Sequence, residues 1–254
     1  MKPILIILFT ISSFAQQDSL SLLDTAFRKN SSTVMLRFLE AWSADSRPDT
    51  SSTDNLQLRT EVSLIYRVFY KPRDYDTLQR GVQPGTLSKR FYLIQNQQKV
   101  VLFDNTRFVN AYSNRLERML QKAETVTLSD FRPALMFDSA SVLYLDSKHK
   151  DALRLFLESQ FDSDSNIQTV DFQRNPAVMD KAKFLSRFFR LYISHWGDHW
   201  LIETPPFVSS IFMDRQCTTA QVHYRVHLLF GTATLKKQNR RWILMNNRIE
   251  DILE

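Results

Sequence analysis

The sequence predicts an α+β protein in which helices pack on a curved antiparallel sheet. Several segments carry apolar residues every three or four positions, which is the spacing of one buried helix face. After Gly197 the pattern changes to alternating apolar and polar residues, the period of a strand with one buried face. The parity of the apolar positions then reverses at Gly231, which is typical of a β-bulge that bends a sheet.

The N-terminal portion is predicted to be rich in helices. Asn30, Ser31 and Ser32 are suited to cap one helix, and Pro72 closes a later one. The apolar stripes of these helices are Met35, Phe38, Leu39 and Trp42, and Leu58, Val62, Ile65 and Phe69. Between Asn105 and Thr127 a helix centred on 115–122 is expected, and 151–161 is also expected to be helical. Segment 142–145 fits either a strand or the start of a helix.

A β-hairpin is predicted within this portion, near residues 90–103. Arg90–Gln95 and Lys99–Phe103 are two strand-like runs, and the polar residues Asn96, Gln97 and Gln98 lie between them. Two such runs separated by a short polar turn are the usual pattern of paired strands.

The C-terminal portion is predicted to be one helix followed by a sheet. Asn175 and Pro176 suit a helix start, since asparagine caps well and proline is tolerated at the first position. The helix is expected to continue to Gly197, with the stripe Leu185, Phe188, Phe189, Tyr192 and Trp196. Strands are expected at 207–213, 220–230 and 241–248, with a polar turn at 236–240.

These patterns predict four parts along the chain. Residues 1–15 form a signal peptide, and residues 16–161 form the helix-rich N-terminal portion. Residues 162–175 are a connecting loop, and residues 176–254 are the helix with its antiparallel sheet.

The C-terminal third also resembles a known family. The resemblance lies in 195–200 (His-Trp-Gly-Asp-His-Trp), 203–206 (Glu-Thr-Pro-Pro), 219–225 (Thr-Ala-Gln-Val-His-Tyr-Arg), Gly231 and Arg241-Trp242. These residues look like the ending of uncharacterised secreted proteins of Bacteroidota, whose C-terminal domain is similar to the NTF2-like, cystatin-type fold. The resemblance implies a curved sheet but no activity, because that fold carries isomerases, hydrolases and plain binding modules.

The first fifteen residues have the composition of a secretory signal. Lys2 precedes an apolar run at 4–11, and Ser13 and Ala15 suit cleavage before Gln16. A membrane anchor is the rival interpretation, but the run is shorter than the roughly 20 residues of a spanning helix. Cys217 is the only cysteine, so neither a lipoprotein cysteine nor an internal disulfide is expected. We therefore expect a secreted or periplasmic protein with no transmembrane span after cleavage.

Charge and glycine content exclude several partner classes. The formal net charge is +6, but the basic residues are spread along the chain, and the one cluster flanks the turn at 236–240. For a secreted chain this balance fits an anionic envelope component better than nucleic acid, which we do not expect as a partner. Only 4 glycines are present, so a glycine-rich phosphate loop is excluded and no cofactor is expected.

Four of the five histidines lie in the C-terminal portion, yet no metal site is predicted. His195 and His199 have helical spacing, but Gly197 lies between them and Trp196 occupies the position of the glutamate that zinc proteases require. His223 and His227 are separated by about 13 Å at the rise of a strand. That distance is too large for both to bind one ion.

The one candidate ligand surface is the polar face of the strand at 220–230. His223, Arg225 and His227 are expected on the face opposite the helices, and Trp200 lies near them in sequence. If that face is the concave side of the sheet, it forms a pocket for a small anionic or sugar-like ligand. The simpler interpretation is an exposed sheet face with ordinary polar residues.

No residue is assigned a catalytic role from the sequence. The leading hypothesis is a non-enzymatic binding or scaffold protein, secreted or periplasmic. The alternative is a small hydrolase or isomerase that uses His223, Arg225 or His227 as acid, base or anion clamp. A third hypothesis is an envelope-interaction protein that uses its basic turn.

Overall fold

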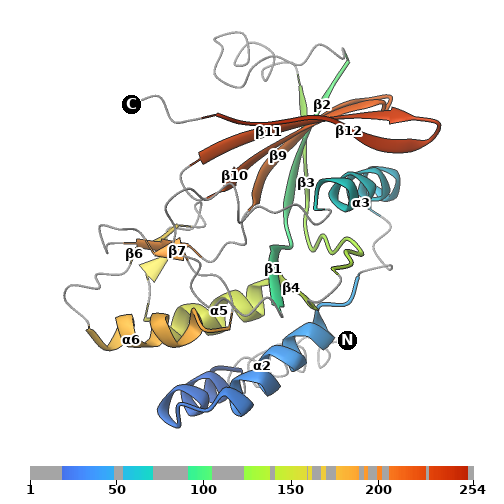
Figure 1. The fold of residues 1–254 in the computed structure, drawn as a ribbon. Helices are drawn as coiled ribbons and strands as arrows, with labels where there is room; N and C mark the ends of the chain where they lie inside the picture. The colour runs from blue at the N-terminus through green and yellow to red at the C-terminus, as the bar shows by residue number, and fades with distance from the viewer. Residues whose placement is uncertain are drawn as a thin grey trace, which may run out of the picture. The chain divides into compact units, whose positions relative to one another are not determined.

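The structure is a computed structural model that describes residues 19–48, 54–70, 91–104, 123–137, 141–158, 160–161, 167–169, 176–188, 192–193, 199–201, 206–226 and 229–250. The predicted α+β class is confirmed (Figure 1). The chain forms two compact units that are interleaved in sequence. Unit 1 consists of residues 1–47, 84–94 and 138–204, and unit 2 consists of 48–83, 95–137 and 205–254.

This division differs from the expected boundary at residues 162–175. Both units contain segments from the N-terminal portion. The four strands between residues 207 and 250 need these segments, because by themselves they would leave the edge at 207–214 unpaired and one apolar face uncovered. The strands and the helix that fill these places come from residues 56–128. The sequence pattern shows each element but not its distant partner.

Unit 1 is built around helices. Residues 19–28 are helical, and they are followed by α2 (Ser32–Asp45), α5 (Ser147–Phe156) and α6 (Pro176–Leu185). The predicted start of α2 is confirmed, since the Ser31 side chain accepts a hydrogen bond from the Val34 N–H at 3.3 Å. Its predicted stripe is buried, together with apolar residues of the other three helices: Leu23, Ala26, Met35, Phe38, Leu39, Trp42, Leu153, Phe156, Val178 and Leu185.

Two small sheets complete unit 1. β1 (Phe91–Gln95), whose last residue falls in unit 2, pairs with β4 (Ser141–Leu145), so the undecided segment 142–145 is a strand. A second sheet has the order β5-β6-β8-β7, from β5 (Gln160–Phe161), β6 (Ile167–Thr169), β7 (Tyr192–Ile193) and β8 (His199–Leu201).

The helix expected to continue to Gly197 ends earlier. α6 stops at Leu185, and the Arg187 and Phe188 N–H groups bond three residues back, which tightens the last turn. Tyr192, expected in the helical stripe, lies in β7 opposite Leu201. Periodicity missed this end because the apolar residues continue past it in nearly helical spacing. Trp196 and Gly197 lie outside the described residues.

Unit 2 contains a six-stranded sheet with the order β12-β11-β10-β9-β2-β3 (Figure 1). The strands are β2 (Gln98–Phe103), β3 (Glu124–Leu128), β9 (Phe207–Asp214), β10 (Thr219–Val226), β11 (Leu229–Gln238) and β12 (Arg241–Glu250). β9 to β12 are antiparallel, as predicted. β2 is antiparallel to β3 but parallel to β9, so the complete sheet is mixed.

The expected hairpin near residues 90–103 is not formed. Both strands exist, but β1 pairs with β4 and β2 pairs with β3 and β9. Residues 96–98 include no glycine and no residue with positive φ, which tight hairpin loops of this length normally need. Phe91 and Leu93 instead join the core of unit 1, whereas Val100 and Val101 are buried in unit 2.

The parity reversal at Gly231 also has a cause other than the expected bulge. The run 220–230 is not one strand, because Val226 pairs with Leu229 and the chain therefore reverses between them. When two residues connect paired strands, the buried residues have even numbers before the connection and odd numbers after it. A β-bulge produces the same change, so periodicity alone does not distinguish the two. The bulges lie between His223 and Tyr224 and between Thr234 and Leu235.

The predicted polar turn at 236–240 is confirmed as a two-residue hairpin. Gln238 pairs with Arg241, and Asn239 and Arg240 have φ of 48° and 63°. Two consecutive positive φ angles match the twist of antiparallel strands.

The helix that covers the sheet of unit 2 is α3 (Leu56–Phe69), not the expected helix after Pro176. Its predicted stripe residues Val62, Ile65 and Phe69 are buried, and the Phe69 ring centroid lies 5.0 Å from that of Tyr224 on β10. Glu61 of α3 also accepts hydrogen bonds from Trp242 Nε1 at 2.8 Å and from Lys237 Nζ. Within the described ranges, no helix is long and apolar enough to cross a bilayer.

Gly231 is required by its neighbour on β10. A Cβ added at Gly231 would lie 2.2 Å from Tyr224 Cζ, so the tyrosine ring occupies the space of any side chain there. The ring is held from two other sides, by Phe69 and by a hydrogen bond from Tyr224 Oη to Asn247 Oδ1 at 2.5 Å. The clash therefore has no easy relief.

We expect Gly231→Ala to destabilise unit 2 by about 2–3 kcal/mol, because overpacking forces a buried ring out of its rotamer. Urea unfolding followed by tryptophan fluorescence measures the change. Tyr224→Leu is the partner variant. In the double variant, Gly231→Ala should cost less than it costs alone. Equal costs in both backgrounds would show that the tyrosine ring is not the obstacle.

Candidate functional site

The sheet of unit 2 has one apolar face and one mixed face. Ala220, Val222, Tyr224 and Val226 of β10 are fully buried on the side of α3, as predicted from their even parity. We call the opposite side the outer face. The register places on it Lys99, Val101, Phe103, Phe207, Ser210, Phe212, Gln221, His223, Arg225, Phe230, Thr232, Thr234, Asn246, Arg248 and Glu250.

His223 is held against an aromatic ring on this face. Its ring centroid lies 4.4 Å from that of Phe212, and its Nε2 lies 3.0 Å from the side-chain oxygen of Gln221. Burial lowers the pKa of His223 to about 4. The imidazole is therefore neutral at pH 7, and it contributes a flat ring and a hydrogen bond but no charge.

Phe212 belongs to a small apolar cluster on the outer face. It stacks on Phe103 with a centroid distance of 5.7 Å and an interplanar angle of 10°, and Val101 and Ala123 complete the group. The packing of this cluster holds the Phe212 ring in place next to His223.

Arg225 lies between two phenylalanines. It pairs with Phe207 on β9 and with Phe230 on β11, so three side chains on adjacent strands form one row. The guanidinium lies 5.7 Å from the centroid of the Phe207 ring, within the range of a cation–π contact. Phe230 remains 44% exposed. This row combines a cation with an accessible aromatic ring.

The structure brings together only part of the predicted site. His223 and Arg225 share the outer face, as the strand period predicted. Trp200 lies in β8 of unit 1, where it pairs with Gln168 and Ile193, and its side chain is outside the described residues. His227 also lies outside the described residues. The site that can be described is therefore formed by β9, β10 and β11.

The row suits binding better than proton transfer. A guanidinium offers a planar fork of donors that matches a carboxylate, and an exposed phenylalanine offers a surface for the C–H groups of a ring. His223 is neutral at pH 7 and becomes an acid only near pH 4. Within the described part of the chain, no group of three histidine, cysteine or carboxylate side chains is placed to hold a metal ion.

Cys217 is placed as a structural residue. It lies in the turn between β9 and β10 with φ of 53°, and burial raises the pKa of its thiol. The neighbouring Asp214 is fully buried and accepts hydrogen bonds from the Thr218 N–H and Oγ1 and from the Thr219 N–H, at 2.6 to 2.9 Å. These bonds close the turn, and a raised pKa leaves Cys217 a poor nucleophile.

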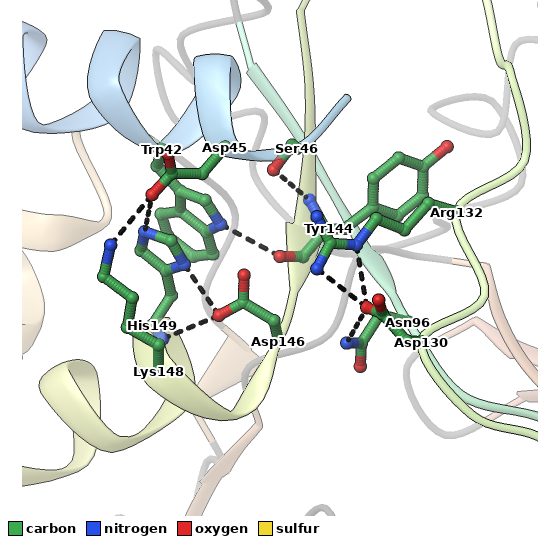
Figure 2. A network of polar contacts seen from close by, with 10 residues as sticks. All are labelled: Trp42, Asp45, Ser46, Asn96, Asp130, Arg132, Tyr144, Asp146, Lys148 and His149. Atoms are coloured by element: carbon green, nitrogen blue, oxygen red, sulfur yellow. Dashed lines mark hydrogen bonds and ion pairs between the residues drawn. The ribbon is translucent and has the colours of Figure 1, made fainter. Parts of the chain in front are cut away.

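Unit 1 holds a polar cluster that the sequence analysis missed (Figure 2). His149, 2% exposed, stacks on Trp42 with a centroid distance of 4.5 Å and an angle of 4°. Its Nδ1 lies 2.7 Å from Asp146 Oδ1, and its Nε2 lies 3.9 Å from Asp45. Lys148 Nζ lies 2.8 Å from the same Asp45 carboxylate.

The contacts of this cluster are those of a helix start. Asp146 caps α5 by accepting the His149 N–H at 2.9 Å, and Trp42 Nε1 donates to the Tyr144 carbonyl at 2.9 Å. A carboxylate that orients a histidine is also found in catalytic sites. Here, however, the ring is enclosed by Trp42 and Asp45. The sequence does contain a sign of this cluster, because Asp146 is followed three residues later by His149. At that spacing an aspartate can cap the helix and also bond the side chain of the residue three positions on.

Acid should destabilise the native chain through His223. The pKa of His223 in the folded chain is about 4, below the usual value of 6.5. Between pH 6.5 and pH 4, His223 is therefore protonated in the unfolded chain but neutral in the folded one. The stability that depends on neutral His223 is thus complete above pH 6.5 and is lost as the pH falls to 4. From pH 7.5 to 4.5, the loss should be about 2–3 kcal/mol larger in the parent than in His223→Leu.

Urea midpoints at both pH values measure this loss of stability, with Arg240→Gln as the surface control. A loss of equal size in all three proteins would contradict the burial of this imidazole.

The Asp146 cap should also be measurable. Asp146→Ala removes the acceptor of the His149 N–H and of its ring, which should cost about 2 kcal/mol. Asp146→Asn keeps a side-chain cap and should cost roughly half as much. Urea unfolding followed by the fluorescence of Trp42 and the other tryptophans reports both changes. If alanine and asparagine cost the same, the cap is not the interaction that holds this cluster.

Comparisons with known proteins add no family to these observations. No protein-family model matches the chain, and no curated protein or solved structure matches it significantly. The resemblance to secreted NTF2-like proteins therefore stays a prediction.

Proposed function

We propose that this chain is a non-enzymatic binding protein, and that its ligand surface is the outer face of unit 2. The ligand class that fits is a carboxylate carried on a sugar-like ring. The observation that carries the proposal is the row Phe207–Arg225–Phe230, which places a guanidinium between two aromatic rings on neighbouring strands. The signal-like pattern of residues 1–15 supports a secreted or periplasmic location.

Arg225 supplies the recognition of the anion. The cation–π contact with Phe207 restrains the guanidinium, so less side-chain freedom remains to be lost when a carboxylate binds. The arginine is partly buried, which strengthens its interaction with an anion relative to a fully solvated side chain.

Phe230 supplies the surface for the ring of the ligand. Large aromatic side chains are usually well covered in a sheet, yet this one is 44% exposed directly opposite Arg225. The apolar face of a sugar ring can cover it while the ring carboxylate reaches the guanidinium. Thr232 lies two residues further along β11 on the same face, where its hydroxyl suits the polar groups of a sugar.

The enzymatic alternative has less support from this face. A hydrolase or isomerase requires an acid or base with a pKa near the working pH. His223 has a pKa near 4, and the guanidinium of Arg225 offers N–H donors but no acceptor atom that could take up a proton. Binding requires neither residue to transfer a proton.

The proposal is tested with galacturonate as the probe and galactose as its neutral match. Saturation-transfer NMR with the whole chain should show contact with galacturonate and a much weaker signal with galactose. Arg225→Gln should weaken galacturonate binding at least about tenfold, because it removes a charged hydrogen-bond donor. Arg225→Lys keeps the charge but loses the planar fork of donors, so its affinity for galacturonate should lie between those of the parent and Arg225→Gln.

Phe230→Ala tests the aromatic part of the site. We expect a loss of about threefold to tenfold in affinity with little change in folding, since the ring is exposed. Arg240→Gln, an exposed arginine of the β11–β12 turn, is the matched control and should bind as the parent does. Equal binding of galactose and galacturonate, or an unchanged affinity in Arg225→Gln, would refute the proposed site.

A further inference from the structure

Resting on the proposed function, we infer that the natural ligand is a polymer. The geometry points to an extended acidic polysaccharide that lies across strands β2, β9, β10, β11 and β12. Its contacts begin at Lys99 on β2 and end at Arg248 on β12, and Arg225 lies between these ends.

The register aligns five residues across the sheet. His223 on β10 pairs with Ser210 on β9 and with Thr232 on β11, and Thr232 pairs with Arg248 on β12. On the other side Val100 pairs with Ile211, so Lys99 on β2 lies beside Ser210 on the outer face. We call these five residues, Lys99, Ser210, His223, Thr232 and Arg248, the cross-strand row.

The row has a cation at each end and neutral groups between. Lys99 and Arg248 are exposed, whereas Ser210, His223 and Thr232 are half-buried. With four strand intervals of ~4.8 Å, the two ends are about 19 Å apart. That separation is too large for one small ligand, but an extended chain with repeated negative charges can contact both ends.

Arg225 provides a third positive charge between these ends. It lies two residues from His223 on the same face of β10, about 7 Å along the strand. No aspartate or glutamate occurs in the cross-strand row, whereas the register places Glu250 of β12 opposite Phe230, next to the row that holds Arg225. The charge of the cross-strand row itself is therefore complementary to a polyanion that follows this row from Lys99 to Arg248.

The neutral side chains favour a polysaccharide over a nucleic acid. Single-stranded nucleic acid is bound by stacking bases on several open aromatic rings. On the outer face Phe103 and Phe212 are buried against each other, and Phe230 is the large exposed ring of the two rows. Ser210 and Thr232 lie between the end cations instead, and Gln221, Thr234 and Asn246 lie in the adjacent row of the same face. Hydroxyl and amide side chains of this kind suit the hydroxyl groups of sugars.

The test uses galacturonate, linear oligogalacturonates of increasing length, methyl-esterified polygalacturonate and a thymidine 20-mer. Isothermal titration calorimetry with the whole chain at low and high salt gives each Kd. We expect affinity to rise with oligomer length until both ends of the row are reached, and to fall at high salt. The esterified polymer, which has lost its charges, should bind at least tenfold more weakly than the free acid.

Lys99→Gln and Arg248→Gln test the two ends. Each should weaken the long oligomers about threefold to fivefold, as for an exposed ion pair, and the double variant about tenfold or more. Binding of galacturonate itself should not change, because the monomer bound at Arg225 and Phe230 contacts neither Lys99 nor Arg248. Arg240→Gln is again the matched control and should leave every Kd unchanged.

The outcomes separate this inference from the proposed function. If galacturonate binds but affinity does not rise with length, the polymer is wrong and the small-ligand site stands. If neither galacturonate nor its oligomers bind, both proposals fail. Tighter binding of the thymidine 20-mer than of the oligogalacturonates would overturn the polysaccharide in favour of nucleic acid.

Discussion

Unit 2 depends on the close approach of Tyr224 to Gly231. The tyrosine ring occupies the space that any side chain at residue 231 would need, which brings β10 and β11 together without a void. Phe69 of α3 packs on this ring, and Asn247 Oδ1 of β12 accepts a hydrogen bond from its hydroxyl. One ring thus joins the covering helix to three neighbouring strands.

Burial of one face leaves the other free to carry different chemistry. Because side chains alternate along a strand, each apolar residue of β10 that packs under α3 places a polar neighbour on the outer face. His223 and Arg225 are such neighbours, and both acquire aromatic contacts from β9. The outer face therefore combines aromatic rings, neutral polar groups and positive charge, the combination on which the proposed recognition of acidic sugars depends.

The two described histidines with known surroundings show how burial sets a role. His149 is almost fully buried, yet Asp146 bonds its ring and its backbone, and the result is a fixed helix start. His223 is less buried, its Nε2 lies next to the Gln221 side-chain oxygen, and burial lowers its pKa to about 4. The first histidine fixes a helix start, and the second stays neutral at pH 7.

The sequence by itself determined the local elements with a dominant period. Strict helical spacing identified α2 and α3, and alternation identified the buried parity of β10, because burial of one face leaves a direct trace in residue order. The strand β9 was identified as a short run set off by two prolines at 205–206. The side chains of His223 and Arg225 were placed on the outer face for the same reason. A two-residue reversal between Val226 and Leu229 has the same parity signature as a bulge, so it could not be distinguished from one.

Tertiary structure decided which elements meet. The parallel pairing of β2 with β9 and the cover of the sheet by α3 join residues more than 100 positions apart, and no periodicity encodes such partners. The same holds for the row Phe207–Arg225–Phe230, which exists only through the register of three strands. The pKa of His223 was likewise beyond the sequence, since it follows from burial against Phe212, whereas residue order fixes only the face on which it lies.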